Sequence, residues 1–128
     1  MKNKIFMIIM VIVVLSIGGL TVMLLLNKTS KTNDFSIAEY SSYIDEFPSE
    51  KVVGFVDNKK IAKEKAELLW LEIYGDSIKD KKPYVVSFDE TNQVWLVQGS
   101  LPKNYDGGVP NILIQKSDGK VLAIWHDK

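Results

Sequence analysis

The sequence predicts an α+β domain behind an apolar N-terminal segment, and three observations lead to that fold class. The chain begins with a long uncharged apolar run, has one strongly amphipathic helical pattern in its middle, and has the composition of β-strands over nearly everything after Pro83. Helical and strand signals in separate parts of a chain are typical of α+β folds, in which helices cover an antiparallel sheet. A length of 128 residues has room for one modest domain.

The apolar run extends from Ile5 to Leu26 and contains no charged residue. At about 1.5 Å per residue, a helix of this length spans roughly 33 Å, which is enough to cross the hydrocarbon core of a membrane. The sequence therefore predicts a transmembrane signal anchor over residues 5–26. A short tail over 1–4 precedes it, and a polar tether over 27–34 follows it.

A cleaved secretory signal is the alternative, because Lys2 and Lys4 precede the run and residues 16–18 have the small-x-small pattern of a cleavage site. The residues after that point continue the apolar run, which favours an uncleaved anchor. Lysines lie on both sides of the span, so their balance decides little about orientation. A short tail before a single span favours a single-pass protein of the cell membrane, with its C-terminal domain outside the cytoplasm.

The clearest helix is predicted from about Asn58 to Tyr74, with Asp57 or Asn58 as the N-cap and Gly75 at the C-cap. Its apolar residues recur at helical spacing: Ala62, Ala66, Leu69 and Ile73, with Trp70 and Ile61 widening the stripe. Lys59, Lys63 and Glu67 are expected on a solvated face. A weaker helical pattern covers Phe35–Ile44, and Lys51–Val56 is expected as a short strand.

Four segments after Pro83 are rich in β-branched and aromatic residues and are separated by turn residues. They are Tyr84–Phe88, Val94–Gly99, Asn111–Lys116 and Val121–His126. Asp118-Gly119 between the last two segments predicts a tight hairpin. Residues 35–128 are thus expected to form one domain, in which one main helix packs on an antiparallel sheet of about four strands.

The composition excludes several classes of function. The chain has no cysteine and a single histidine, His126, so thiolate chemistry is excluded and a metal site is not expected. All 16 basic residues are lysine, and arginine is the usual residue for bidentate phosphate capture. Residues 1–31 carry a net charge of +4 and residues 32–128 a net charge of −4. A nucleic-acid partner is therefore not expected.

The segment Leu101–Pro110 is the most unusual stretch, because two prolines bracket a tyrosine and a pair of glycines. This pattern predicts a shaped loop. The loop is either a structural connection or part of a contact surface. In the second case we expect Tyr105, Asp106, Gly107 and Gly108 to contribute a binding surface, together with Asp89 and Glu90 of an earlier turn. If the partner is a basic protein, Asp89, Glu90 and Asp106 would attract it by complementary charge.

Residues 54–128 resemble the NTF2-fold immunity proteins of bacterial polymorphic toxin systems. The resemblance begins with Gly54-Phe55-Val56 and continues through the helix to Tyr74-Gly75 and then Lys82-Pro83-Tyr84. It continues through the strand at Val94 and the Gly107-Gly108-Val109-Pro110 loop to the hairpin at Gly119. The motif residues that specify shape are Trp70, Tyr74, Gly75, Pro83, Trp95, Gly99, Pro102, Pro110 and Gly119.

The resemblance implies a small NTF2-like (cystatin-like) domain that binds and neutralises a cognate toxin, with no catalysis and no cofactor. The lipid bilayer is the second expected partner, through residues 5–26. A full NTF2-like cone has more helices and a longer sheet than this sequence shows. Two other functions stay open: a small extracytoplasmic ligand-binding or enzymatic domain, and an envelope accessory protein.

Overall fold

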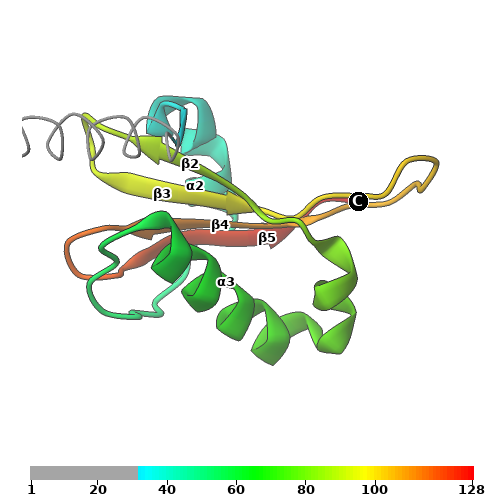
Figure 1. Ribbon diagram of the computed structural model, residues 1–128. Coiled ribbons are helices and arrows are strands. Elements are labelled where there is room, and N and C mark those ends of the chain that lie inside the picture. Colours follow the sequence, from blue (N-terminus) through cyan, green and yellow to red (C-terminus); the bar gives the residue numbers. More distant parts are fainter. Residues whose placement is uncertain (1–31) are drawn as a thin grey trace, which may run out of the picture. The chain divides into compact units, whose positions relative to one another are not determined.

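A computed structural model describes residues 32–128, so the predicted tail and anchor lie outside the described residues. The described part contains a five-stranded sheet in the order β1-β2-β3-β4-β5 (Figure 1). The strands are β1 (Asn33–Asp34), β2 (Val85–Asp89), β3 (Val94–Gln98), β4 (Pro110–Gln115) and β5 (Val121–His126). The four longer strands are antiparallel to their neighbours, as predicted, whereas β1 pairs in parallel with β2.

The helix α3 (Lys59–Tyr74) covers one face of the sheet and confirms the main helix of the sequence analysis. Its first turn is capped by the Asn58 side chain, whose Oδ1 accepts a hydrogen bond from the Ile61 backbone N–H at 3.0 Å. Gly75 ends the helix with a φ of 83°, a conformation that glycine adopts without steric cost. Four residues of the predicted apolar stripe are buried, Ile61 is half-buried, and Ile73 is 43% exposed at the last turn.

The opposite face of the sheet is covered by a second layer that the sequence analysis predicted only as a weak helix. This layer consists of the 3-10 helix η1 (Ile37–Tyr40) followed by the helix α2 (Ser41–Glu46). The Tyr43 ring stacks on Trp125 of β5 at 4.6 Å between ring centroids. The sheet is therefore sandwiched between α3 on one side and η1–α2 on the other.

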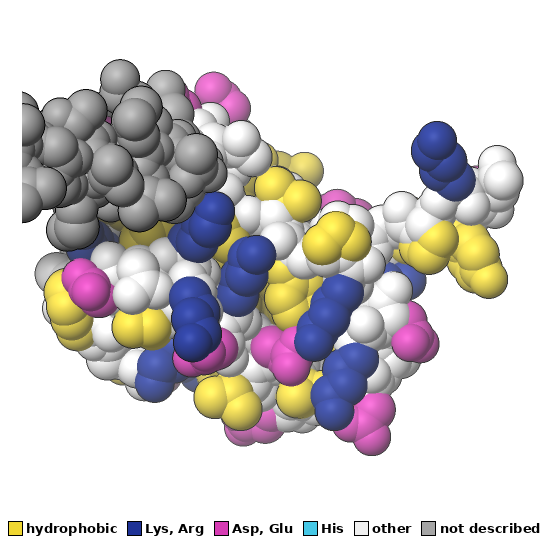
Figure 2. All heavy atoms as spheres, in the orientation of Figure 1, with side chains coloured by type: hydrophobic (Ala, Val, Ile, Leu, Met, Phe, Trp, Pro, Cys, Tyr) yellow, Lys and Arg dark blue, Asp and Glu magenta, His cyan; other side chains and the backbone are white. Residues whose placement is uncertain are grey.

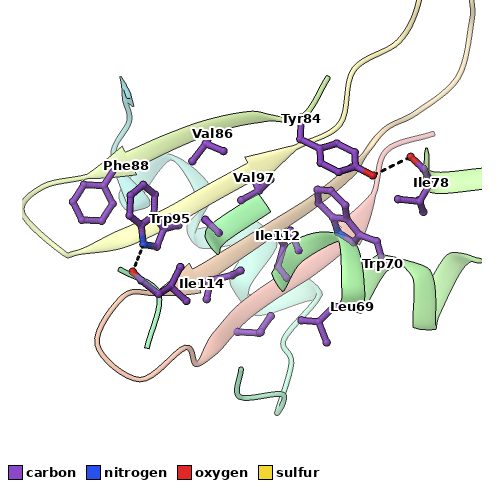
Figure 3. Close-up of a cluster of buried hydrophobic side chains, with 14 residues drawn as sticks. Leu69, Trp70, Ile78, Tyr84, Val86, Phe88, Trp95, Val97, Ile112 and Ile114 are labelled. Carbon is purple, nitrogen blue, oxygen red and sulfur yellow. Dashed lines mark hydrogen bonds between the residues drawn. The ribbon is translucent and has the colours of Figure 1, made fainter. Parts of the chain in front are cut away.

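Successive side chains along each strand point to opposite faces of the sheet, so the strands contribute to two separate apolar clusters. In β3, Trp95 and Val97 pack under α3, whereas Val94 and Leu96 belong to the cluster under η1–α2. Figure 3 shows the cluster under α3, in which the Trp95 Nε1 donates a hydrogen bond of 2.9 Å to the Val56 carbonyl. A sheet buried on both faces explains why its strands are nearly continuous apolar runs.

Three segments differ from their predictions. Residues 51–56 form no strand, because Val52 makes only an isolated bridge with Lys120. Asn33 and Asp34, predicted as the end of the tether, form β1 along β2. A 3-10 helix, η2 (Asp76–Lys81), lies between α3 and β2 and carried no periodic signal in the sequence.

Candidate functional site

The loop between β3 and β4 has a base fixed by hydrogen bonds to two neighbouring segments. Ser100 contributes two of them: its N–H donates to the Lys81 carbonyl at 2.6 Å, and its Oγ donates to the Pro83 carbonyl at 2.6 Å. On the other side, the Asp127 N–H donates to the Val109 carbonyl at 3.0 Å. The loop is thus joined at its base to the end of η2 and to the end of β5.

The tip of this loop, residues 102–107, is exposed and extends beyond the sheet (Figure 1). Tyr105 is 69% exposed, the largest exposed fraction among the exposed large apolar side chains of the described chain. Asn104 and Gly107 have φ angles of 71° and 131°, so the tip turns through left-handed conformations. A projecting aromatic side chain on a loop with a fixed base is a common form of protein-binding contact.

A hollow of about 610 Å³ lies beside the base of the loop, and we call it the loop-end hollow. Its lining residues come from η2, from the loop and from β5: Ser77, Asp80, Lys81, Leu101, Pro102, Tyr105 and His126. The His126 ring makes an edge-to-face contact with Tyr74 at 5.3 Å between centroids, and its Nδ1 lies 2.7 Å from the Asp127 carbonyl oxygen. The hollow therefore combines aromatic rings with one carboxylate and one ammonium group.

The structure divides the predicted binding residues between the two ends of the sheet. Tyr105 lines the loop-end hollow, and Asp106 and Gly107 lie at the exposed tip beside it. Gly108, also predicted to contribute to the surface, is buried against the backbone of Asp127. Asp89 and Glu90 lie at the turn between β2 and β3, at the far end of strands that are roughly 17 Å long. The six residues therefore do not form one patch.

Asp89 also differs from its prediction in burial, since it is only 3% exposed. Its Oδ2 accepts hydrogen bonds from the Ile37 N–H at 2.8 Å and the Asn92 Nδ2 at 3.0 Å, and its Oδ1 accepts from the Asn92 N–H at 2.9 Å. The hydrogen bond from the Asn92 side chain, with those from backbone N–H groups, lowers the pKa of Asp89. Asp89 is thus a structural residue that joins η1 to the β2–β3 turn.

Two comparisons with known proteins bear on this arrangement. A family model described as NTF2 fold immunity protein matches residues 61–128, which is more than half of the chain.

The chain belongs to the NTF2 fold immunity protein family.

The chain is also 38% identical over 79 residues to the uncharacterized protein YhhH of Escherichia coli (strain K12). The alignment covers 60% of this chain and 61% of YhhH, so the chain spans about three fifths of the length of that relative. No solved structure matches the chain. An immunity protein protects against a toxin and is not itself a catalyst, so the family directs attention to surfaces that contact another protein.

The family-motif residues have the structural positions that their types suggest. Trp70 and Trp95 are buried under α3, and the Trp70 Nε1 lies 3.4 Å from the Asn111 carbonyl oxygen. Gly99, at the end of β3, has no room for a side chain, because a Cβ there would lie 2.7 Å from the Pro110 ring. Tyr74 is half-buried, Pro110 and Gly119 are buried, and Gly75, Pro83 and Pro102 are exposed. Most of the motif therefore maintains the fold.

Sequence reasoning missed five members of the loop-end hollow: Ser77, Asp80, Lys81, Leu101 and His126. His126 is the last residue of β5, as the predicted strand bounds place it, and β5 is an edge strand of the sheet. His126 lines the hollow only because η2 lies beside the loop and forms part of its wall. The only sequence signal for η2 is the short interval between the helix-ending Gly75 and Pro83.

A second hollow, the α3 groove, lies on the side of the sheet that α3 covers, and has a volume of about 660 Å³. Its lining residues are Lys60, Lys63, Glu64 and Glu67 of α3 with Lys82, Pro83 and Tyr84. Glu67 forms an ion pair of 3.2 Å with Lys82. The Tyr84 hydroxyl and then Lys82 lower the pKa of Glu67, whereas burial raises that of Tyr84.

Within residues 32–128, no group of three or more His, Asp or Glu side chains is placed to hold a metal ion. No helix in that range is long and apolar enough to cross a membrane. The predicted anchor over residues 5–26 lies outside the described residues and stays a prediction.

Proposed function

We propose that this chain is a membrane-anchored immunity protein that binds and neutralises a cognate bacterial toxin without catalysis, and that the toxin contacts the loop end of the sheet. The observation that carries the proposal is the projecting loop of a chain that belongs to an immunity family. The tip presents Tyr105 to solvent, while the base is fixed to η2 and β5. A preformed aromatic contact loses little conformational entropy when a partner binds.

Anchoring through residues 5–26 and an extracytoplasmic position for the domain are parts of the same proposal. They rest on the uncharged apolar run over residues 5–26. An immunity protein held at the membrane would meet its toxin as the toxin enters the cell. The domain itself carries 12 lysines and 16 acidic residues over 32–128, which suits a basic toxin.

A small-molecule function has one observation in its favour, the presence of Asp80 and His126 in the loop-end hollow. Its volume lies within the usual range for ligand sites. We place this function second because the hollow lies at the surface beside an exposed loop, whereas the two apolar cores fill both faces of the sheet.

Replacing Tyr105 with alanine tests the toxin-binding surface. We expect this variant to bind the product of the neighbouring toxin gene roughly 30-fold more weakly, since a central aromatic contact contributes about 2 kcal/mol. Titration calorimetry of the purified pair measures the affinity, and co-expression of both genes measures protection. The free energy of unfolding should change by less than about 0.5 kcal/mol, because the side chain is exposed.

Leu68→Ala is the matched control, because Leu68 is 63% exposed on α3, away from the loop. Its affinity for the toxin should equal that of the unaltered chain. Equal affinities for both variants would remove the loop from the binding surface. The absence of any complex or protection with the unaltered chain would overturn the toxin-binding function itself.

A further inference from the structure

The two layers that cover the sheet carry opposite charge. Residues 32–50, which include η1 and α2, contain five acidic residues and no lysine. Residues 58–82, which include α3 and η2, contain seven lysines and five acidic residues. The net charges are −5 and +2, so the two faces of one thin domain differ by seven charges. Figure 2 shows lysine side chains, in dark blue, spread over the surface formed by α3 and η2.

The lysines of the α3 groove differ in their ion pairing. Lys82 is paired with Glu67, which neutralises one carboxylate of the groove. Lys60 and Lys63, one helical turn apart on the same side of α3, form no ion pair with a described residue. Leu68 is 63% exposed and lies one turn after Glu64, on the outward side of the helix. The outward side of α3 thus carries ammonium groups without an ion pair among the described residues and, two turns after Lys60, an exposed apolar side chain.

The length of the predicted tether limits the distance between the α3 side of the domain and a membrane. The apolar run ends at Leu26, and the described domain begins at Thr32, six residues later. Six extended residues span at most about 20 Å. The chain enters the domain through β1, which pairs with β2, and the groove residues Lys82–Tyr84 lead directly into β2. The groove therefore lies close to the point where the tether joins the domain.

We propose that the α3 face, which is the surface formed by α3 and η2, rests on the anionic surface of the bilayer. Lys60, Lys63 and Lys82 of the α3 groove then lie toward the lipid phosphates, and the acidic η1–α2 layer is directed away from the bilayer. This inference rests on the proposed membrane anchor. A lysine near an anionic membrane surface favours binding by about fivefold. The tether keeps the effective concentration of the surface high, so a weak contact is enough to orient the domain.

The test uses the full-length chain in vesicles of phosphatidylcholine, with or without phosphatidylglycerol. Because the chain has no cysteine, a single cysteine at Leu68→Cys or at Ser42→Cys on α2 accepts an environment-sensitive fluorophore at one site. We expect the Leu68→Cys label to enter an apolar environment only in the vesicles with phosphatidylglycerol, and high salt to reverse the change. The Ser42→Cys label should stay in water in both.

Charge-reversal variants then test which lysines contact the anionic membrane surface. Lys60→Glu with Lys63→Glu should lower the ratio of membrane-bound to free α3 face by at least roughly 25-fold, because the loss of each lysine costs about fivefold and each new carboxylate is repelled by the lipid phosphates. Lys120→Glu with Lys128→Glu is the matched control, because it changes the net charge equally at exposed positions outside the groove. This control should leave the fluorescence of the Leu68→Cys label unchanged.

Each contrary result has a distinct meaning. A Leu68→Cys label that stays in water in both vesicle types, or equal effects of the two double reversals, overturns the lipid contact. A label that responds only to the added toxin assigns the groove to an acidic segment of the toxin instead. A chain that fails to float with either vesicle type overturns both the anchor and the lipid contact, whereas toxin binding is measured separately through Tyr105.

Discussion

Asp89 shows how one side chain can join three parts of the domain. Its carboxylate accepts hydrogen bonds from Ile37 at the start of η1 and from two nitrogens of Asn92 in the β2–β3 turn. The pairing with Asn92 is local, and an acidic residue at the start of a turn suggests it from sequence alone. The contact with Ile37 is 52 residues away in the chain, and no local pattern shows it. The prediction of Asp89 as an exposed binding residue was therefore wrong.

Asp89→Ala should lower the free energy of unfolding by about 2 kcal/mol, because three partly buried hydrogen bonds lose their charged acceptor. Urea denaturation at neutral pH measures this change. Glu90→Ala, at the next and exposed position, should change it by less than about 0.5 kcal/mol. Equal effects of the two substitutions would show that the hydrogen bonds of Asp89 contribute nothing to stability.

The same residue gives a pH dependence with a definite sign. The pKa of Asp89 is lower in the folded state than the unfolded value of about 3.9, so its stabilising contribution is present above that value. The contribution is lost as the pH falls through the folded pKa. The difference in unfolding free energy between the unaltered chain and Asp89→Ala should therefore shrink below about pH 4. A difference that stays constant down to pH 2 would contradict this account.

At the scale of elements, the segment 51–56 forms backbone hydrogen bonds with the β4–β5 hairpin although it is not a β-strand. Val53 and Val56 donate backbone hydrogen bonds of 2.9 Å to the carbonyls of Gly119 and Lys116 in the β4–β5 hairpin. Gly119 has a φ of 72°, and a Cβ there would collide with the backbone of Gly54. The absence of a side chain at Gly119 thus allows the hairpin and the segment to approach closely.

Gly119→Ala should destabilise the domain by about 3 kcal/mol, since it combines an unfavourable φ with a backbone collision. Gly54→Ala is the matched control, because its φ of 80° is equally unfavourable but the space around it is open. We expect that variant to lose only about 1 kcal/mol. Thermal unfolding followed by circular dichroism measures both, and a loss for Gly54→Ala as large as that for Gly119→Ala would contradict the proposed collision.

The elements with strong local signals were predictable from the sequence. The helix predicted from Asn58 begins at Lys59, and the last strand has the bounds that were predicted. The polar strand β1 was not predictable, because Asn33 and Asp34 gain their pairing only from β2. The loop tip was predicted as a contact surface from its prolines and glycines. The hollow beside it depends on η2 and on the long-range approach of His126, for which the sequence has no periodic signal.

For the whole molecule, the decisive feature is that the sheet is covered on both faces. The family match begins at residue 61 and so excludes the η1–α2 layer. Yet Tyr40, Tyr43 and Ile44 of that layer pack on the cluster that includes Trp125. The layer is therefore part of the folding unit of this chain, although its short helices give only weak local signals.

A chain truncated to residues 51–128 should lose cooperative unfolding and bind a dye for exposed apolar surface, because the face that carries Leu96, Leu113 and Trp125 would be in water. A chain truncated to 32–128 keeps the layer and should unfold in one cooperative transition. Calorimetry of the two truncated chains measures the difference. Cooperative unfolding of both would show that the layer is dispensable.

The parallel pair of β1 and β2 also determines how the domain responds to a mechanical pull. A force on the residues before Thr32 acts first on a strand of two residues at the edge of the sheet, and next on the Ile37–Asp89 hydrogen bond. The long antiparallel strands β3, β4 and β5 lie behind these contacts and bear the force last. Such a pull would therefore separate β1 from β2 before it reaches the strands of the core under α3.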